Sequence, residues 1–94
     1  MILRIVKMKF KPQYINNFLK LFKKEKKNIY NQEGCLKLNL YKDINCEKTY
    51  FTYSIWKNEI LLNRYRNSKL FQDIWPKTKK CFAEKAKAWS LSRK

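Results

Sequence analysis

The chain has 94 residues, of which 45% are hydrophobic and 16% aromatic, and its formal net charge is +16. This hydrophobic content excludes a disordered chain. The length predicts one domain over residues 1–94, with a core so small that further burial by oligomerisation is expected. The first apolar residues are interrupted by Arg4 and Lys7, and no apolar run is long enough to cross a bilayer. We therefore expect no signal peptide, no membrane partner and a cytoplasmic location.

The three cysteines, Cys35, Cys46 and Cys81, are odd in number and widely spaced, and the sequence contains no histidine. A disulfide framework needs an even set in a secreted context, and a zinc site needs closely spaced ligand pairs. Histidine is also the commonest metal ligand and proton shuttle. The sequence therefore argues against a metal site. Nothing around the three thiols indicates a lowered pKa, and a redox role for them stays open.

The excess of 23 basic over 7 acidic residues has two explanations. A basic surface raises the affinity for nucleic acid. Alternatively, the heavy use of lysine and asparagine reflects the base composition of an AT-rich genome. Lysines occur in every segment without forming one stripe, and arginine, which is suited to bidentate phosphate and base contacts, occurs only four times. This distribution favours a solvated surface over a dedicated nucleic-acid site.

The first half of the chain predicts a strand and then a long helix. Residues 2–10 carry apolar side chains on both faces of a strand, which belongs inside a sheet. Pro12 suits the first turn of a helix. A helix over 12–31 then places its apolar residues on one stripe: Ile15, Phe18, Leu19, Phe22 and Ile29.

Gly34 is the only glycine and falls where this helix must end. Glycine adopts the left-handed backbone angles common just past a helix C-terminus at no steric cost. The apolar spacing then changes to alternation in residues 35–42, and a third strand follows over 48–57. The short polar link between these strands predicts an antiparallel hairpin.

The second half predicts two helical pieces and a last strand. Asn58 and Ser68 are suited to cap the pieces, and Pro76 is expected to break or restart the second one. Residues 86–92 predict the last strand. The order β-α-β-β-α-β is the ferredoxin-like α+β arrangement, in which helices cover one face of a four-stranded antiparallel sheet. Because the other face would carry large apolar side chains, we expect a homodimer through this open sheet face.

Several short segments resemble one known family over essentially the whole chain. They are Glu33-Gly34-Cys35, Leu40-Tyr41-Lys42-Asp43, Phe51-Thr52-Tyr53-Ser54-Ile55-Trp56, Asn58-Glu59, the helix with Tyr65, and Ser68-Lys69-Leu70-Phe71. Together these segments resemble the antibiotic biosynthesis monooxygenase (ABM) family, whose ferredoxin-like subunits form dimeric α+β barrels. Taken singly, each segment is weak evidence for the family, because these residues mostly encode the fold.

The resemblance implies one of three activities: oxidation of phenols or quinols by molecular oxygen without metal or flavin, degradation of haem, or no assigned reaction. Haem-degrading members use an asparagine in the first strand, then a tryptophan and a histidine in the second helix. The corresponding places here hold Lys7 or a neighbour, Tyr65 and Trp75. Since the chain has no histidine, the resemblance argues against haem degradation and against the autoinducer-processing relatives.

Cofactor-free oxidation needs a phenol or quinol held in a dry aromatic pocket, deprotonated, and hydrogen bonded as the anion. Members with this chemistry use Asn, Trp, Tyr and Arg side chains. The resemblance therefore implies a candidate pocket for an aromatic small-molecule ligand, formed by Tyr53, Trp56, Tyr65, Arg66 and Trp75. No cofactor is expected, and no catalytic residue is identified. Asn58 and Asn63 are more simply a cap and a surface residue.

Each candidate also has a structural alternative. Trp56 is expected to pack in the core, and Tyr53 can serve a pocket or a structural hydrogen bond. Tyr65 and Trp75 can both face the sheet, and Arg66 can be solvated. Arg4 is an arginine between apolar neighbours in the first strand and needs a carboxylate or a rim position. We expect it at the sheet edge or at the dimer interface.

Three functions therefore compete. The first is an ABM-like homodimer that binds or oxidises a planar phenolic or quinol compound. The second is a non-catalytic ABM-fold protein that binds a ligand or a protein partner. The third is nucleic-acid binding, because RNA-recognition domains share this strand order. Those domains expose aromatics within a glycine-containing central strand, and the third strand here has no glycine. The sequence favours the first two over nucleic-acid binding.

Overall fold

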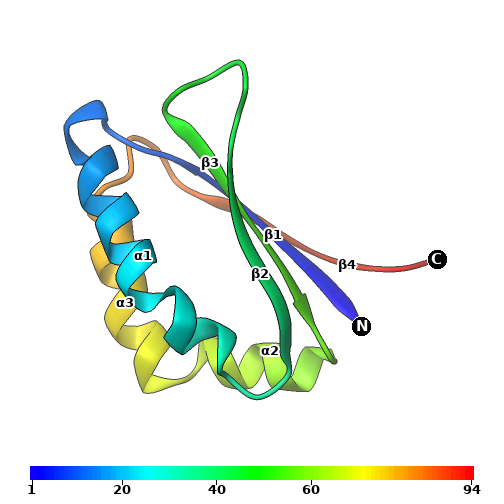
Figure 1. The fold of residues 1–94 in the computed structure, drawn as a ribbon. Coiled ribbons are helices and arrows are strands. Elements are labelled where there is room, and N and C mark those ends of the chain that lie inside the picture. Colours follow the sequence, from blue (N-terminus) through cyan, green and yellow to red (C-terminus); the bar gives the residue numbers. More distant parts are fainter.

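All 94 residues are described by a computed structural model, whose elements follow the predicted order (Figure 1). They are β1 (Ile2–Lys9), the 3-10 turn η1 (Pro12–Tyr14), α1 (Ile15–Tyr30), β2 (Cys35–Lys42), β3 (Thr49–Trp56), α2 (Glu59–Arg66), α3 (Lys69–Lys79) and β4 (Lys87–Ser92). The ferredoxin-like α+β prediction is confirmed. The long helix predicted over 12–31 is divided into η1 and α1.

The four strands form one antiparallel sheet in the order β2-β3-β1-β4. β1 pairs with β3 from Ile2↔Trp56 to Lys9↔Thr49, and on its other side Ile2 pairs with Ser92 of β4. β1 is thus an interior strand, as its two apolar faces predict. β2 and β3 form the predicted hairpin.

The three α-helices all cover the same face of this sheet (Figure 1). Even-numbered residues of β1 point toward the helices, and Met8 and Phe10 are 2% and 0% exposed. Phe10 stacks on Phe18 of α1, with ring centroids 4.2 Å apart. The predicted apolar stripe of α1 is confirmed by the burial of Phe18 and Ile29.

The opposite face of the sheet carries the odd-numbered strand residues and has no helix over it (Figure 1). We call this the open face. Trp89 and Leu91 of β4 remain 43% and 46% exposed. The register places further apolar side chains beside them on β1 and β3: Leu3, Ile5, Phe51, Tyr53 and Ile55.

Gly34 has a φ of +89°, so the predicted need for left-handed angles is confirmed. Its position differs from the prediction, because α1 ends at Tyr30 and Gly34 lies in the following turn, where Cys35 N–H donates to the Gln32 carbonyl. A Cβ at this position would lie 2.6 Å from Leu61 Cβ of α2. The glycine therefore serves the turn and also the close approach of α2.

Both predicted helix caps are present. Asn58 Oδ1 accepts a hydrogen bond from Leu61 N–H at 2.9 Å, and Ser68 Oγ accepts one from Phe71 N–H at 3.2 Å. Ser68 Oγ also donates to the Tyr65 carbonyl at 2.6 Å, and this ties the end of α2 to the start of α3. These bonds satisfy N–H groups that a helix start leaves without partners.

Pro76 does not break the second helix, contrary to the prediction. It lies inside α3, which continues to Lys79. Proline cannot donate to the carbonyl of Gln72, but Gln72 is exposed, so solvent can hydrate that carbonyl. The helical backbone hydrogen bonds then continue, because Lys80 N–H donates to the Pro76 carbonyl at 3.2 Å.

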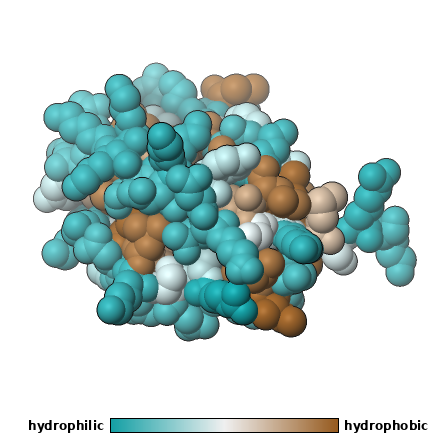
Figure 2. Space-filling view, turned by 60° about the horizontal axis from the view of Figure 1, so that its bottom comes forward, coloured by the Kyte–Doolittle hydropathy of each residue, from teal (hydrophilic) through white to brown (hydrophobic).

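Hydrophilic side chains cover most of the face shown in Figure 2, and hydrophobic ones form separate patches between them. Ion pairs neutralise little of the charge, since the structure contains only three: Lys9–Glu84, Arg64–Glu33 and Lys77–Asp73. None of the helices combines the length and apolar character needed to cross a membrane.

Candidate functional site

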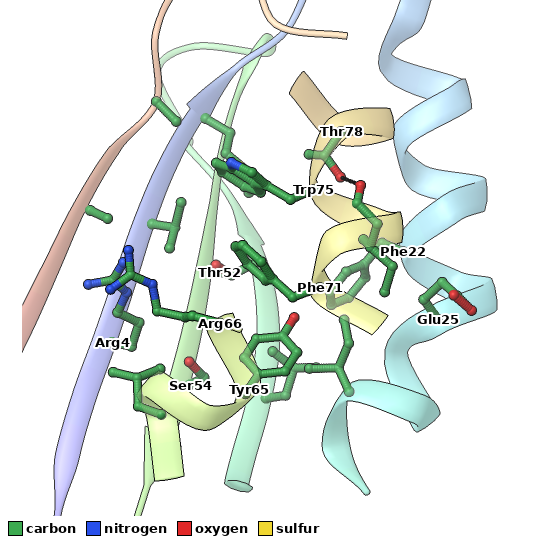
Figure 3. Close-up of a pocket in the computed structure, with 18 of the residues that line it drawn as sticks. Arg4, Phe22, Glu25, Thr52, Ser54, Tyr65, Arg66, Phe71, Trp75 and Thr78 are labelled. Atoms are coloured by element: carbon green, nitrogen blue, oxygen red, sulfur yellow. Dashed lines mark hydrogen bonds between the residues drawn. The ribbon is translucent and has the colours of Figure 1, made fainter. Parts of the chain in front are cut away.

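A cavity of about 280 Å³ lies between the sheet and the helices (Figure 3). Of its 21 lining residues, 15 are hydrophobic. It exists because the middle of the helix-facing side of the sheet carries small side chains, with Ala88, Val6 and Thr52 side by side in the register. The helices are held away by the larger core residues Met8 and Trp56 on either side of this row.

Aromatic rings from β3, α2 and α3 form one wall of the cavity. Trp56 and Tyr65 stack with ring centroids 5.0 Å apart, and Phe71 and Trp75 stack at 5.6 Å. Tyr65 meets Phe71 edge to face at 5.3 Å and joins the two pairs. A wall of this kind suits a flat, apolar ring system.

The Tyr65 hydroxyl is the polar group of this wall. It makes no hydrogen bond to another protein group and keeps some solvent access, and Figure 3 shows it pointing into the space between the helices and the sheet. Burial raises the pKa of Tyr65 well above its usual value, and the charges of Cys35 and Glu25 add to the effect. The hydroxyl therefore stays protonated near neutral pH and can donate a hydrogen bond to a ligand.

Two arginines lie at one end of the cavity, Arg4 on β1 and Arg66 at the end of α2 (Figure 3). Arg4 is half-buried and donates from Nη1 to Ser90 Oγ at 2.8 Å. Burial lowers the pKa of Arg4, and the nearby Arg66 charge lowers it further. Neither guanidinium has a carboxylate within ion-pair distance. This end of the cavity is thus strongly cationic.

The cavity opens to solvent at this cationic end. Arg66 and Ala88 are exposed there, and Arg4 is half-buried. The opposite part is closed by buried side chains: Phe18, Ile29, Leu38, Leu62 and Ile74. We call the end with Arg4 and Arg66 the mouth. A ligand that enters through it passes from charged surroundings into apolar ones.

The sequence profile described as "Antibiotic biosynthesis monooxygenase" (ABM) matches residues 1–76. The chain belongs to the ABM family. No curated protein matches it in sequence.

Solved structures with the same fold cover nearly all of this ABM chain. A conserved protein from Methanosarcina mazei Go1 is 23% identical, with a TM-score of 0.94 over 100% of this chain and 94% of its own. A structure described as an antibiotic biosynthesis monooxygenase is 16% identical, with a TM-score of 0.92 over 99% and 98%. A protein from Mycobacterium tuberculosis is 13% identical, with a TM-score of 0.90 over 98% and 93%. These similarities show the ABM fold.

Five residues were expected to form the pocket, and four of them line the cavity: Trp56, Tyr65, Arg66 and Trp75. Trp56 is 1% exposed, so it is a core residue as well as a lining residue. Tyr53 does not line the cavity, contrary to the expectation. It lies on the open face, where it pairs with Ile5 and its ring meets that of Tyr41 at 6.2 Å.

Arg4 also differs from its expected place. β1 is an interior strand, so Arg4 is not at the sheet edge, and its side chain faces the helices rather than the open face. The rim position was the correct alternative. The hydroxyl of Ser90 and the solvent at the mouth make this site tolerable for a cation between apolar neighbours.

Sequence reasoning missed Glu25, which is 8% exposed and lines the cavity from α1. Its carboxylate accepts a hydrogen bond from Asn28 Nδ2 at 3.1 Å. The spacing of Phe18, Phe22, Glu25 and Ile29 follows the apolar stripe, so periodicity could have found it. The flanking lysines instead made the segment read as surface.

The site holds no obvious metal ligands. Glu25 is the only acidic residue in the lining, which contains no cysteine, and no three Cys, Asp or Glu side chains come together anywhere in the chain. What the arrangement offers is an apolar space, the hydroxyl of Tyr65 with those of Thr52, Ser54 and Thr78, and two guanidinium groups.

Proposed function

We propose that this ABM-family chain binds a planar phenolic or quinol-type molecule in its cavity and oxidises it with molecular oxygen, without a cofactor. The observation that carries the proposal is the aromatic cavity of about 280 Å³ with the unpartnered Tyr65 hydroxyl inside it. Small-molecule pockets are mostly apolar, with a few polar groups that fix orientation. The volume of about 280 Å³ lies just below the usual range of about 300–1,000 Å³ and suits a small ring system.

The lining residues can supply the hydrogen bonds and the apolar walls that this chemistry needs. Tyr65 can donate a hydrogen bond to the ring oxygen, and the two guanidinium groups favour an anionic ligand. The walls of Phe71 and Trp75 exclude water from the electron-rich ring. In the overall reaction, a phenol with a free para position and O₂ give a para-quinone and water. One oxygen atom becomes the new carbonyl, the other leaves as water, and the ring supplies the electrons.

The test is aerobic incubation with a panel of 1-naphthols and other phenols whose para position is free, with oxygen uptake followed by electrode and ¹⁸O₂ incorporation by mass spectrometry. We expect turnover above autoxidation, with one labelled atom in the product. Tyr65→Phe should lower kcat by about 10²–10³-fold, the usual cost of removing a single oxyanion donor. Tyr30→Phe, on the exposed end of α1, is the matched control and should be unchanged.

Unchanged substrates throughout the panel would contradict catalysis. Quenching of tryptophan fluorescence by the same compounds would then identify the alternative, a non-catalytic ABM-fold protein that binds ligands, because Trp56 and Trp75 line the cavity. Absence of both turnover and quenching would contradict a small-molecule site altogether and leave an interaction protein.

We further propose that the protein is a homodimer through its open face. ABM-fold proteins are generally dimeric. The open face supports the proposal, since Trp89 and Leu91 leave large apolar side chains in water unless a partner covers them.

We also propose a cytoplasmic location, because all three cysteines are unpaired, as suits a reducing compartment.

A further inference from the structure

Neither arginine at the mouth has a carboxylate partner, although Arg4 is half-buried and half-buried cations are usually paired. Arg4 donates to one serine hydroxyl, and the Arg66 side chain makes no hydrogen bond in the protein. With 23 basic and 7 acidic residues, many surface cations must lack a counter-ion. Arg4 and Arg66 differ from these lysines because they share one cavity and approach each other there.

Arg64 shows the contrast on the same helix. It points outside the cavity, and its Nη1 lies 3.2 Å from Glu33 Oε2. No such carboxylate reaches the mouth. Glu25, the only acid in the lining, lies across the cavity on α1 (Figure 3). The protein therefore supplies no anion of its own to Arg4 and Arg66.

Two like charges held together without a counter-ion repel each other, and the repulsion is stronger where protein displaces solvent. An anion bound between them removes this cost and gains charge-assisted hydrogen bonds from both planar groups. The two guanidinium groups come from different elements, β1 and α2, so they can hydrogen bond to one anion from two sides (Figure 3). The small side chain of Ala88, which pairs with Val6 beside Arg4, leaves room for it at the mouth.

We propose that the ligand of this cavity is a planar aromatic carboxylic acid, whose carboxylate is bound by Arg4 and Arg66 and whose ring lies along the wall of Phe71 and Trp75. This inference rests on the proposed function and adds the acid group to it. The cavity thus binds ring acids that bear a phenolic oxygen more tightly than it binds neutral phenols. The carboxylate stays at the wet mouth, while the ring fills the apolar part.

The test compares three probes by fluorescence titration and calorimetry: 6-hydroxy-2-naphthoate, the matching neutral 6-hydroxy-2-naphthamide, and 2-naphthol. We expect the acid to bind at least tenfold more tightly than the amide. Arg66→Gln should abolish most of this preference, by lowering the affinity for the acid at least tenfold more than the affinity for 2-naphthol. Because Arg66 is exposed and has no contact to lose, this variant should fold normally.

A protein of net charge +16 attracts any anion, so a matched control is needed. Arg64→Gln removes the same charge from the same helix, outside the cavity, and should keep the preference for the acid. Arg4→Gln should behave like Arg66→Gln, with circular dichroism to confirm its folding.

The outcomes separate the two proposals. Equal affinities for acid and amide, with 2-naphthol still bound, would overturn the acid assignment and keep the ring site. A preference that Arg64→Gln reduces as much as Arg66→Gln would also overturn it, because general charge would then explain the binding. Failure of all three probes to bind would overturn both proposals.

Discussion

The rings of Trp56 and Tyr65 stack with centroids 5.0 Å apart, and this contact joins the last residue of β3 to α2. Trp56 Nε1 also donates to Ser54 Oγ at 3.0 Å, so the buried indole is hydrogen bonded as well as packed. One side chain thus closes the core at this end of the sheet and fixes a wall of the cavity. Stability and ligand binding are linked through it.

Replacement of Trp56 by alanine should therefore be severely destabilising. Truncation of a buried tryptophan costs about 3–5 kcal/mol of the free energy of unfolding, and Ser54 would lose its partner. Urea unfolding followed by circular dichroism at fixed protein concentration measures the loss. Tyr30→Ala is the control, because Tyr30 is 50% exposed, and it should change the free energy by less than about 0.5 kcal/mol. Equal losses in the two variants would contradict a core role for Trp56.

Residue periodicity predicted the helices and strands well. The candidate site was instead predicted from residue types in the segments that resemble the family. Tyr53 and Trp56 are three residues apart in one strand, so they must face opposite sides of the sheet. Selection by residue type alone put both in one pocket. The nearness of Arg4 and Arg66 lay beyond sequence reasoning, because it depends on where the end of α2 lies relative to the sheet. Pro76 failed as a helix breaker because tertiary packing overrode a local preference.

Gly34→Ala should be strongly destabilising. The substitution places a side chain at φ +89° and a Cβ 2.6 Å from Leu61 Cβ, so either the turn or α2 must move. Overpacking of this kind costs about 1–3 kcal/mol, and the backbone strain adds to it. Asn31→Ala is the control at the end of the same helix, where φ is −78°. Comparable urea midpoints for the two variants would show that α2 is not held against the turn.

The proposed homodimer predicts a mass of twice the 11.6 kDa chain in sedimentation equilibrium. Trp89→Lys puts a charge in the open face and should shift the mass to that of one chain, because burial of a lysine in an apolar interface is costly. The indole is 43% exposed in the single chain, so folding should be unaffected. Tyr30→Lys, on the helical side, should stay dimeric. A wild-type protein of 11.6 kDa, or dissociation by Tyr30→Lys alone, would contradict the open-face dimer.

The three thiols should differ in reactivity. Thr49 Oγ1 donates to Cys46 Sγ at 3.2 Å, and this hydrogen bond is the main cause of a lowered pKa of Cys46. Burial raises the pKa of Cys35 and of Cys81. The expectation that nothing marks a lowered thiol pKa was therefore wrong for Cys46, because the hydrogen bond forms only when the hairpin closes.

Iodoacetamide at pH 8 should accordingly alkylate Cys46 first, since the thiolate is the nucleophile. Thr49→Val removes the donor at nearly constant volume and should slow the labelling of Cys46 several-fold, as measured by peptide mass spectrometry over time. Thr52→Val, which alters a lining residue away from the hairpin link, should leave the rate unchanged. Faster labelling of Cys35 or Cys81 in the wild-type protein would contradict this ranking.

Tyr65 should make the protein sensitive to alkaline pH. Its pKa is raised in the folded state, so the unfolded state loses its proton first as the pH rises. The stabilisation from Tyr65 is thus complete below pH 10, the ordinary tyrosine pKa, and is lost as the pH rises toward the folded pKa. The slope is at most about 1.4 kcal/mol per pH unit for one proton.

Urea unfolding of the wild type and of Tyr65→Phe between pH 7 and about pH 11 measures this slope. The difference in the free energy of unfolding between the two should be constant below pH 10 and should shrink above it. Every other ionisable group is common to both proteins, so the comparison isolates the contribution of Tyr65. Tyr30→Phe should follow the wild type, because Tyr30 is exposed. Parallel curves for the wild type and Tyr65→Phe above pH 10 would mean that the Tyr65 hydroxyl is hydrated in the folded protein, and that the cavity is too wet for the oxidation proposed for it.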